Sequence, residues 1–189
     1  MSAIRSITVF CSSSRDVAPV YLIAARELGA GIAEHGWQLV FGGNDVGCMA
    51  ALAEGARVAG GHVVGVTPQL LVDKGIADRK CHELIITGDM RERKALMEQR
   101  GDAFVALPGG VGTLEELFEI LVGRYLGFHN KPLVLLNIAG YYDPLLQMLQ
   151  HGIEQHFIKP RIHDFLFVTD QVTAALRHLQ QLSTGRGET

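Results

Sequence analysis

Short apolar segments alternate with helix-forming segments along almost the whole chain. A short apolar run is typical of a strand buried on both faces, whereas apolar residues spaced three and four apart indicate a helix with one buried side. The predicted strands cover residues 7–11, 38–41, 62–66, 83–87, 104–107, 133–138 and 165–168. The clearest helical stripes are Tyr21, Ala25, Leu28, Ile32 and, later, Leu145, Met148, Leu149, Ile153. Because such alternation requires crossover connections, we expect a doubly wound, Rossmann-like α/β fold: a parallel sheet of about seven strands with helices on both faces.

The length and composition are those of one domain. The chain has 189 residues, of which 48% are hydrophobic and 20% charged, and a chain of this kind can bury one sizeable core. No repeat or Pro-rich linker divides it, so we predict a single α/β domain over residues 1–182 and a disordered tail over residues 183–189. Gly36 and the Gly60-Gly61 pair lie where helices are expected to end, and we assign them to helix C-caps.

The charge and the cysteines exclude several classes of protein. A net charge of -3 disfavours a nucleic-acid partner, and we interpret the small basic cluster of Arg91, Arg93 and Lys94 as a local anion site. The three cysteines are widely spaced, which favours reduced thiols in a cytoplasmic protein. The first apolar run is too short for a signal peptide or a membrane span, so we expect no membrane partner.

Three glycines connect the fifth predicted strand to the helix that follows it. Residues 107–116 read LPGGVGTLEE, and in a parallel sheet such a loop lies at the carboxyl edge, where ligands bind. Glycines let backbone N–H groups approach an anion closely, and the helix N-terminus adds partial positive charge. The loop therefore predicts a phosphate site, with the carboxylates of Glu115 and Glu116 beside it.

Two further loops lie at the same predicted edge. Residues 42–49 read GGNDVGCM and follow the second strand, and residues 12–15 read SSSR and follow the first. Two glycine-rich turns on one edge favour a ligand site more strongly than one does. Neither G-x-G-x-x-G nor G-x-x-x-x-G-K-[ST] occurs, which disfavours a standard NAD site and a P-loop.

One arginine falls on an otherwise apolar helical face. Arg93 lies between Met90 and Met97 at spacings of three and four. A buried, unpaired arginine would cost several kcal/mol, so Arg93 would need an anionic partner. Two plainer interpretations stay open: Arg93 could extend past the methionines to solvent, and Thr113 with Glu116 could form a capping box that only starts a helix.

Other catalytic patterns are missing from the sequence. The eight histidines show no H-x-H or H-E-x-x-H pattern, so we predict no metal. No G-x-S-x-G elbow occurs, which leaves no case for a serine nucleophile.

Taken together, the motifs resemble those of a known family. Residues 108–116 match the pattern P-G-G-x-G-T-x-x-E, and Arg93-Lys94 matches the Arg-Lys pair that accompanies it. The resemblance is to the LOG family, the cytokinin riboside 5′-monophosphate phosphoribohydrolases, whose members were long labelled lysine decarboxylases. It runs from about Ile7 to about Phe157 and includes the segment Gly-Tyr-Tyr at 140–142. The older label finds no support, because no lysine stands in an evident Schiff-base setting.

The resemblance implies an activity and a set of residues. The activity is hydrolysis of the N-glycosidic bond of a purine or cytokinin nucleoside 5′-monophosphate, without metal or organic cofactor, to give free base and ribose 5-phosphate. Glu116 would stabilise the oxocarbenium-like transition state and orient the attacking water, and Arg93 would be the second catalytic residue. The loop at 109–113 would surround the phosphate, and the loop at 42–49 would close over the nucleotide. The implied substrate-binding residues are Gly42, Gly43, Met49, Lys94, Pro108, Gly109, Gly110, Val111, Gly112, Thr113 and Glu115.

Two departures from the family pattern bear on the substrate. Many members read G-G-G-x-x-G-L-M-G where this chain has Asn44, Asp45 and Ala50 within the corresponding turn, and many carry a substrate-contacting Glu where it has Gly75. The base therefore stays open between adenine, its N6-prenylated form and other purines.

Alternatives from other classes also stay open. A nucleotide-binding or molybdenum-cofactor carrier would need the phosphate cradle but no carboxylate at the anomeric carbon, so Arg93 and Glu116 together argue against it. An NAD enzyme with an unusual loop is a weaker alternative. The resemblance further implies a homodimer with active sites near the subunit interface; the helix around residues 117–125 is a candidate for that interface, although its apolar stripe could equally be core.

Overall fold

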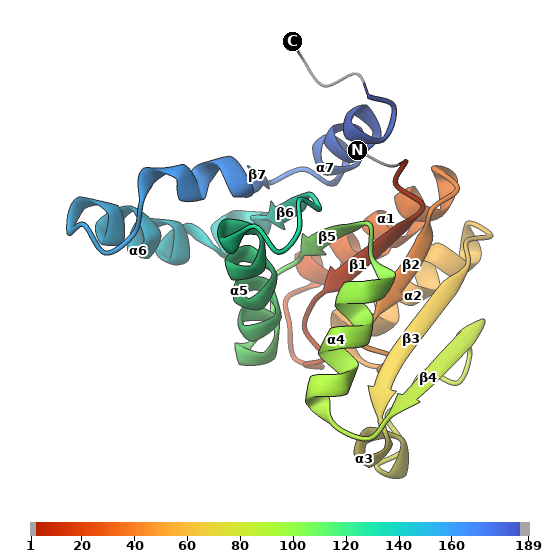
Figure 1. Cartoon of the computed structure of the whole chain (residues 1–189). Coiled ribbons are helices and arrows are strands. Elements are labelled where there is room, and N and C mark those ends of the chain that lie inside the picture. Colours follow the sequence, from red (N-terminus) through yellow and green to blue (C-terminus); the bar gives the residue numbers. More distant parts are fainter. Residues whose placement is uncertain (1–2, 186–189) are drawn as a thin grey trace.

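A seven-stranded sheet lies between two layers of helices in the computed structural model, which describes residues 3–185 (Figure 1). All neighbouring strands are parallel, in the order β4-β3-β2-β1-β5-β6-β7. The strands are β1 (Ser6–Phe10), β2 (Gln38–Phe41), β3 (Val63–Pro68), β4 (Glu83–Thr87), β5 (Ala103–Ala106), β6 (Leu133–Leu136) and β7 (Phe167–Thr169). The chain proceeds outward from β1 in one direction as far as β4 and then in the other direction from β5 to β7. The predicted doubly wound fold is confirmed, and its order reverses between β1 and β5.

Helices cover both faces of the sheet (Figure 1). They are α1 (Pro19–Glu34), α2 (Gly47–Val58), α3 (Gln69–Asp73), α4 (Met90–Arg100), α5 (Val111–Leu126), α6 (Asp143–Glu154) and α7 (Val172–Ser183), with 3₁₀ turns η1 (Ile138–Gly140) and η2 (Pro160–Phe165). One core cluster joins α1, α2 and α7 to the sheet, and the other joins α4, α5 and α6. Successive strand residues divide between the two, Val9 to the first and Phe10 to the second, which is why the strands are uniformly apolar.

Glycines set the distance between α1 and α2 and end both helices. A methyl carbon at Gly29 would overlap the Leu52 carbonyl oxygen, and one at Gly55 would overlap that of Arg26. Gly36 and Gly60 follow α1 and α2 with φ values of +71° and +76°, the left-handed conformation of a C-cap glycine. The predicted C-cap positions of these two glycines are confirmed.

Several predicted boundaries are wrong by one or two residues. The sixth strand ends at Leu136, because Ala139 and Gly140 have positive φ and turn the chain into η1. The last strand begins at Phe167, since Phe165 still belongs to η2. The first ends at Phe10, so Cys11 already leaves the sheet.

Two further expectations need correction. Met148 does not share the buried side of α6 but is largely exposed. The predicted tail starts too early: Ser183 ends α7, and its hydroxyl accepts a hydrogen bond of 3.0 Å from the Ile4 amide. Thr184 is the C-cap of α7, and the part of that prediction at residues 186–189 lies outside the described residues. No helix within residues 3–185 is both long and apolar enough to cross a membrane.

Candidate functional site

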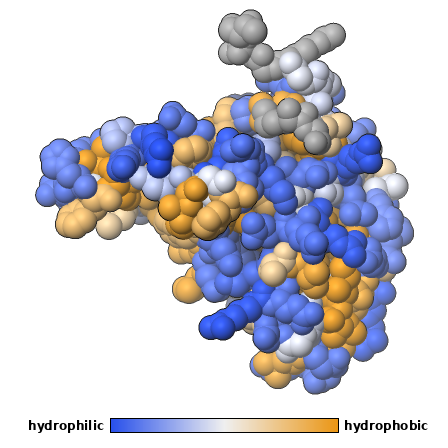
Figure 2. Space-filling model, in the orientation of Figure 1, coloured by the Kyte–Doolittle hydropathy of each residue, from blue (hydrophilic) through white to orange (hydrophobic). Residues whose placement is uncertain are grey.

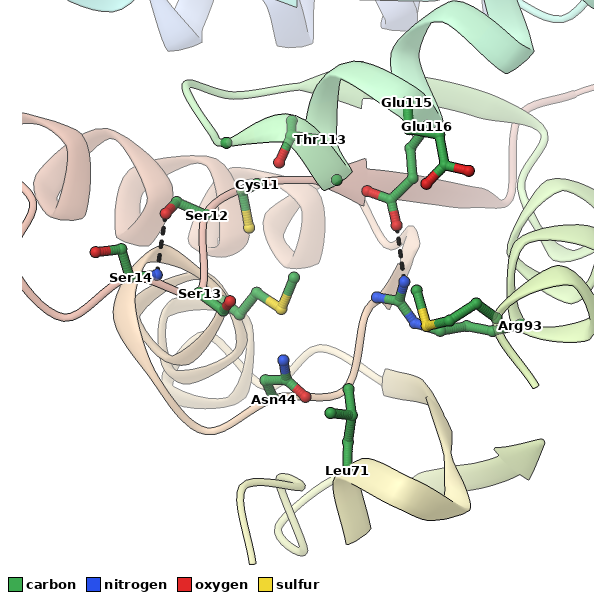
Figure 3. Close-up of a pocket in the computed structure, with 14 residues that line it drawn as sticks. Cys11, Ser12, Ser13, Ser14, Asn44, Leu71, Arg93, Thr113, Glu115 and Glu116 are labelled. Atoms are coloured by element: carbon green, nitrogen blue, oxygen red, sulfur yellow. Dashed lines mark hydrogen bonds and ion pairs between the residues drawn. The ribbon is translucent and has the colours of Figure 1, made fainter. Parts of the chain in front are cut away.

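A cavity of about 400 Å³ opens at the carboxyl edge of the sheet. The segments that follow β1, β2, β3, β4 and β5 all contribute to its wall, as expected where the strand order of an open α/β sheet reverses. The predicted residues that line it are Met49, Arg93, Gly110, Gly112, Thr113, Glu115 and Glu116. Part of the site predicted from the sequence therefore lines a single cavity (Figure 3).

A buried ion pair lies in the wall of this cavity. Arg93 Nη1 donates to Glu116 Oε1 at 2.9 Å, and the two side chains are only 5% and 6% exposed. Arg93 Nε donates to the Val66 carbonyl oxygen at 3.0 Å and Nη2 to that of Gly42 at 3.4 Å. A side chain at Gly42 would overlap the guanidinium group, so this glycine makes room for Arg93. The alternative in which Arg93 reaches solvent is wrong.

Local structure explains why Arg93 points inward. Asp89 caps α4 by accepting hydrogen bonds from the backbone amides of Arg91 and Glu92, at 2.8 and 2.9 Å. Those bonds hold the pKa of the Asp89 carboxyl below its usual range. Because the cap sets where α4 starts, Arg93 falls on the turn that faces the sheet, on the same buried side as Met97.

Two features of the environment of Glu116 shift its pKa in opposite directions. Burial raises the pKa of Glu116, the Arg93 guanidinium lowers it in part, and the net pKa lies above the ordinary glutamate value of 4.5. Within residues 3–185 the second carboxylate oxygen, Oε2, accepts no hydrogen bond. Arg93 thus orients one oxygen of Glu116 and leaves the other for an occupant of the cavity.

The N-terminus of α5 faces the same cavity. The helix begins at Val111 with Gly110 as its N-cap and without a side-chain cap, so its first amides are free to bind an anion. The buried Thr113 adds a hydroxyl in this first turn, and a side chain at Gly109 would overlap it. The capping-box alternative is wrong, because α5 starts before Thr113 and Glu116 pairs with Arg93.

The basic cluster is not one anion site. Lys94 Nζ lies 2.7 Å from Glu115 Oε1 and 2.8 Å from Glu119 Oε2, and these hydrogen bonds raise the pKa of Lys94. Arg91 is exposed. That interpretation of the sequence is wrong, because the anions that meet Arg93 and Lys94 are carboxylates of the protein itself.

Known proteins of similar sequence decide the family. The profile of a family described as "Possible lysine decarboxylase" matches residues 49–179. A cytokinin riboside 5′-monophosphate phosphoribohydrolase of Mycobacterium tuberculosis is 45% identical over 91% of this chain and 91% of its own. One from Rhodococcoides fascians is 43% identical over 91% of this chain and 87% of its own. The chain belongs to the LOG family.

Solved structures show that the LOG fold is shared more widely. A molybdenum cofactor carrier protein of Chlamydomonas reinhardtii superimposes with a TM-score of 0.72 at 28% identity, covering 95% of this chain and 98% of that one. A molybdenum cofactor binding protein of Rippkaea orientalis, at 23% identity and a TM-score of 0.72, shares the fold.

Some residues implied by the LOG motifs do not line the cavity. Gly42, Gly43, Lys94, Pro108, Gly109 and Val111 are not among the lining residues. Tyrosines of the Gly-Tyr-Tyr segment hold the loop before α5: Tyr142 donates to the Leu107 carbonyl oxygen at 2.7 Å and Tyr141 to that of Gly109 at 2.6 Å. Gly75 also lies outside the lining, where its φ of +71° ends α3.

Other lining residues were not predicted as site residues. They are Cys11, Ser12, Ser13, Ser14, Asn44, Leu71 and Met90. The serines and Asn44 belong to loops that the sequence had placed at this edge, and Met90 belongs to the apolar face of α4. No sequence pattern predicted that Leu71 belongs to the site, because α3 is too short to show a helical period. Within residues 3–185 no group of three or more His, Cys, Asp or Glu side chains is placed to hold a metal ion.

Proposed function

We propose that this LOG-family protein hydrolyses the N-glycosidic bond of purine nucleoside 5′-monophosphates, releasing the free base and ribose 5-phosphate. The observation that carries the proposal is the buried pair of Arg93 and Glu116 beside the free N-terminus of α5. The names of the relatives at 43–45% identity support the reaction class.

The phosphate end of the substrate is assigned to the start of α5. Gly110 and Gly112 have no atom within 4 Å of where a side chain would begin, so their backbone is open to the cavity. The first amides of α5 and the Thr113 hydroxyl then offer hydrogen bonds to a dianion at the positive end of the helix. No lysine or arginine is required for this contact.

We assign the Glu116 carboxylate to C1′, the sugar carbon at which the bond breaks. Breaking the bond between C1′ and the base nitrogen builds positive charge on the ribose ring, and a nearby carboxylate stabilises that charge. Water adds its oxygen to C1′, the bond electrons leave with the base, and the proton given up by water ultimately restores the neutral base. Oε2 of Glu116 orients this water, while Arg93 holds Oε1 and favours the ionised form against the effect of burial.

Glu115 occupies the rim beside this carbon. Its carboxylate lines the cavity while one of its oxygens accepts a hydrogen bond from Lys94. We assign it to the ribose hydroxyls, with Lys94 as the residue that positions it. Met49, which also lines the cavity, offers an apolar contact to the nucleoside.

The carrier alternative keeps support from the fold, since a molybdenum cofactor carrier is a structural neighbour at 28% identity. A carrier has no use for a buried carboxylate with one oxygen free to meet a sugar carbon. The two functions differ in outcome, because a carrier binds its ligand and releases it unchanged.

The test is chromatography of purified protein incubated with AMP or with N6-isopentenyladenosine monophosphate. We expect release of free base, and we expect Arg93→Ala and Glu116→Gln to lower its rate at least about a hundredfold. Glu119→Gln is the matched control: Glu119 lies one turn further along α5 and pairs with Lys94 outside the cavity, so base release should persist. Tight binding of both nucleotides without release of base would favour the carrier.

We also propose that the protein is a cytoplasmic homodimer. Apolar side chains gather on the projecting α6 segment (Figure 2), where Phe157 is 90% exposed, and Phe128 after α5 is nearly as open. Exposed apolar side chains that gather into one patch mark an interaction surface. Cys11, Cys48 and Cys81 are free thiols, which suits a reducing compartment. Light scattering should give the mass of a dimer for the wild type and of a monomer for Phe157→Asp.

A further inference from the structure

Asn44, in the wall of the candidate site, carries a buried amide oxygen without a hydrogen-bond partner in the described part of the chain. Asn44 is 6% exposed and lines the cavity, and within residues 3–185 its side-chain oxygen Oδ1 accepts no hydrogen bond. A buried amide oxygen without a partner is costly, and most such atoms in native proteins are satisfied. An occupant of the cavity that carries a hydrogen-bond donor would satisfy it.

The loop around Asn44 does not depend on this side chain. The Asp45 amide donates to the Ile76 carbonyl oxygen at 2.9 Å, and the Asp78 amide donates to that of Gly43 at 2.7 Å. Asp78 is in turn buried and paired with Arg57 at 2.7 Å. Because backbone bonds and a separate ion pair hold the loop, the Asn44 amide is available to a ligand.

The position of Asn44 assigns it to one end of the nucleotide. Asn44 and Leu71 lie across the cavity from Thr113, with Glu116 and Arg93 at one side (Figure 3). If the phosphate binds at the start of α5 and C1′ lies near Glu116, the base extends toward Asn44 and Leu71. An apolar side chain beside an amide suits a flat ring with a polar edge.

We propose that the Asn44 amide recognises the 6-amino edge of the base and makes this protein select 6-aminopurine nucleotides over 6-oxopurine nucleotides. This inference rests on the proposed function for the placement of the phosphate and the sugar. An asparagine amide pairs with adenine through two bonds, in which Oδ1 accepts from N6–H and Nδ2 donates to N7. A 6-oxopurine presents acceptors at both O6 and N7, so Oδ1 would face another oxygen and remain unpaired. An N6-alkylated adenine keeps one N6–H and stays within the selected class.

The experiment compares AMP with IMP, which differ at the 6-position and in the accompanying N1 proton. We expect the wild type to have the higher kcat/KM for AMP, and Asn44→Ala to lower the AMP-to-IMP ratio about tenfold, chiefly through loss of AMP turnover. Lys80→Ala is the control: Lys80 is exposed, lies outside the 42–49 loop and does not line the cavity. Its ratio should equal that of the wild type. An equal loss for both nucleotides in Asn44→Ala, or an unchanged ratio, would overturn the assignment.

Binding measurements separate this inference from the proposed function. In a Glu116→Gln background, calorimetry with AMP, IMP and ribose 5-phosphate reports recognition without turnover. We expect Asn44→Ala in that background to weaken AMP binding about tenfold and to leave ribose 5-phosphate binding unchanged. Unchanged binding of ribose 5-phosphate would also show that the phosphate-binding part of the site is intact. If the wild type released no base while this binding pattern held, the hydrolase proposal would fail and the role of Asn44 would stand. Equal affinity for AMP and IMP with the amide present would overturn the role of Asn44, as would absence of nucleotide binding.

Discussion

At the scale of single residues, Arg93 and Glu116 place two charges where an unpaired charge is most costly. A buried ion pair seldom adds to stability, because desolvation offsets the attraction, yet removal of one partner strands the other. Two observations favour a chemical reason for keeping the pair: it lies in the cavity wall, and Arg93 uses only one Glu116 oxygen. Stability measurements can separate this chemical reason from a structural one.

We predict a strongly non-additive mutant cycle for this pair. Arg93→Met should lower the free energy of unfolding by about 3 kcal/mol, because it leaves Glu116 buried and unpaired. The double variant Arg93→Met/Glu116→Leu should recover to within about 1 kcal/mol of the wild type while remaining inactive. Urea denaturation measures each term, and Lys94→Met, whose partners are exposed, should cost less than about 1 kcal/mol. A double variant as unstable as the sum of the singles would show that the two side chains contribute independently to stability, without a coupling energy between them.

The raised pKa of Glu116 predicts opposite effects of pH on activity and on stability. The proposed mechanism uses the ionised Glu116 carboxylate, so kcat/KM should fall as the pH drops through the raised pKa, at a pH above the ordinary value of 4.5. The folded state binds this proton more readily than the unfolded state does. The contribution of Glu116 to stability is therefore fully present below the unfolded pKa and is lost as the pH rises through the folded one.

A pH series of kcat/KM for AMP, paired with urea denaturation at the same pH values, checks both effects. Glu116→Gln should remove this component from the stability profile, since the amide does not titrate. An acid limb at or below pH 4.5 would contradict the raised pKa.

The residues of the site differ in how far the sequence could predict them. Arg93 was predictable because an arginine on an apolar helix face needs an anionic partner, and Glu116 because it belongs to the motif that this chain shares with the LOG family. The sequence marked Asn44 as a departure that bears on the substrate, but it did not predict the burial of Asn44, which depends on backbone hydrogen bonds between its loop and residues 76 and 78. The supporting hydroxyls of Tyr141 and Tyr142 reach back more than thirty residues, in hydrogen bonds with sequence separations of 32 and 35.

At the scale of elements, the close packing of α1 on α2 depends on two glycines. We predict that Gly29→Ala and Gly55→Ala each lower the free energy of unfolding by about 1–3 kcal/mol, because the added carbon would meet a backbone oxygen that cannot rotate away. Thermal or urea denaturation provides the measurement. Gly112→Ala is the control, since that helical glycine has no atom within 4 Å of the new carbon, and its stability should not fall. Wild-type stability in Gly29→Ala would mean that the two helices can separate at little cost.

The strands and long helices were predictable for a physical reason, and the short elements were not. A parallel strand covered on both faces must be apolar throughout, so each apolar run marked one. Its ends depend on where neighbouring strands stop, as at Leu136, and on turns such as the positive φ of Ala139. The helix α3 spans five residues, too few for a period, although Leu71 from it lines the cavity.

At the scale of the whole molecule, the topology brings distant loops to one site. The segments after β1 and β5 are about a hundred residues apart in sequence, yet these strands pair directly through Val9 and Val105. The alternation of strand and helix predicts this meeting in general terms, because parallel strands end at the same edge of the sheet. It does not predict which side chains close the cavity, since that depends on the packing of α3 and α4 against the strands.

The reactivity of the three cysteine thiols should report global unfolding of the protein. Only the thiolate reacts with a disulfide reagent, and burial raises the pKa of Cys48 from 9.0 to about 11 and that of Cys81 to about 12. These shifts lower the reactive fraction about a hundredfold and a thousandfold near neutral pH. Cys11 is buried too, and burial also raises its pKa.

We therefore predict slow labelling of the native protein by Ellman's reagent, with all three thiols reacting together as urea populates the unfolded state. A bound nucleotide should slow the reaction by the factor 1 + [L]/Kd, because it binds the folded state alone. Cys81→Ser tests whether the least buried thiol reacts through a separate local motion: the remaining two should keep their rates. Fast reaction of one thiol that neither urea nor nucleotide changes would show that its part of the structure opens independently of the rest.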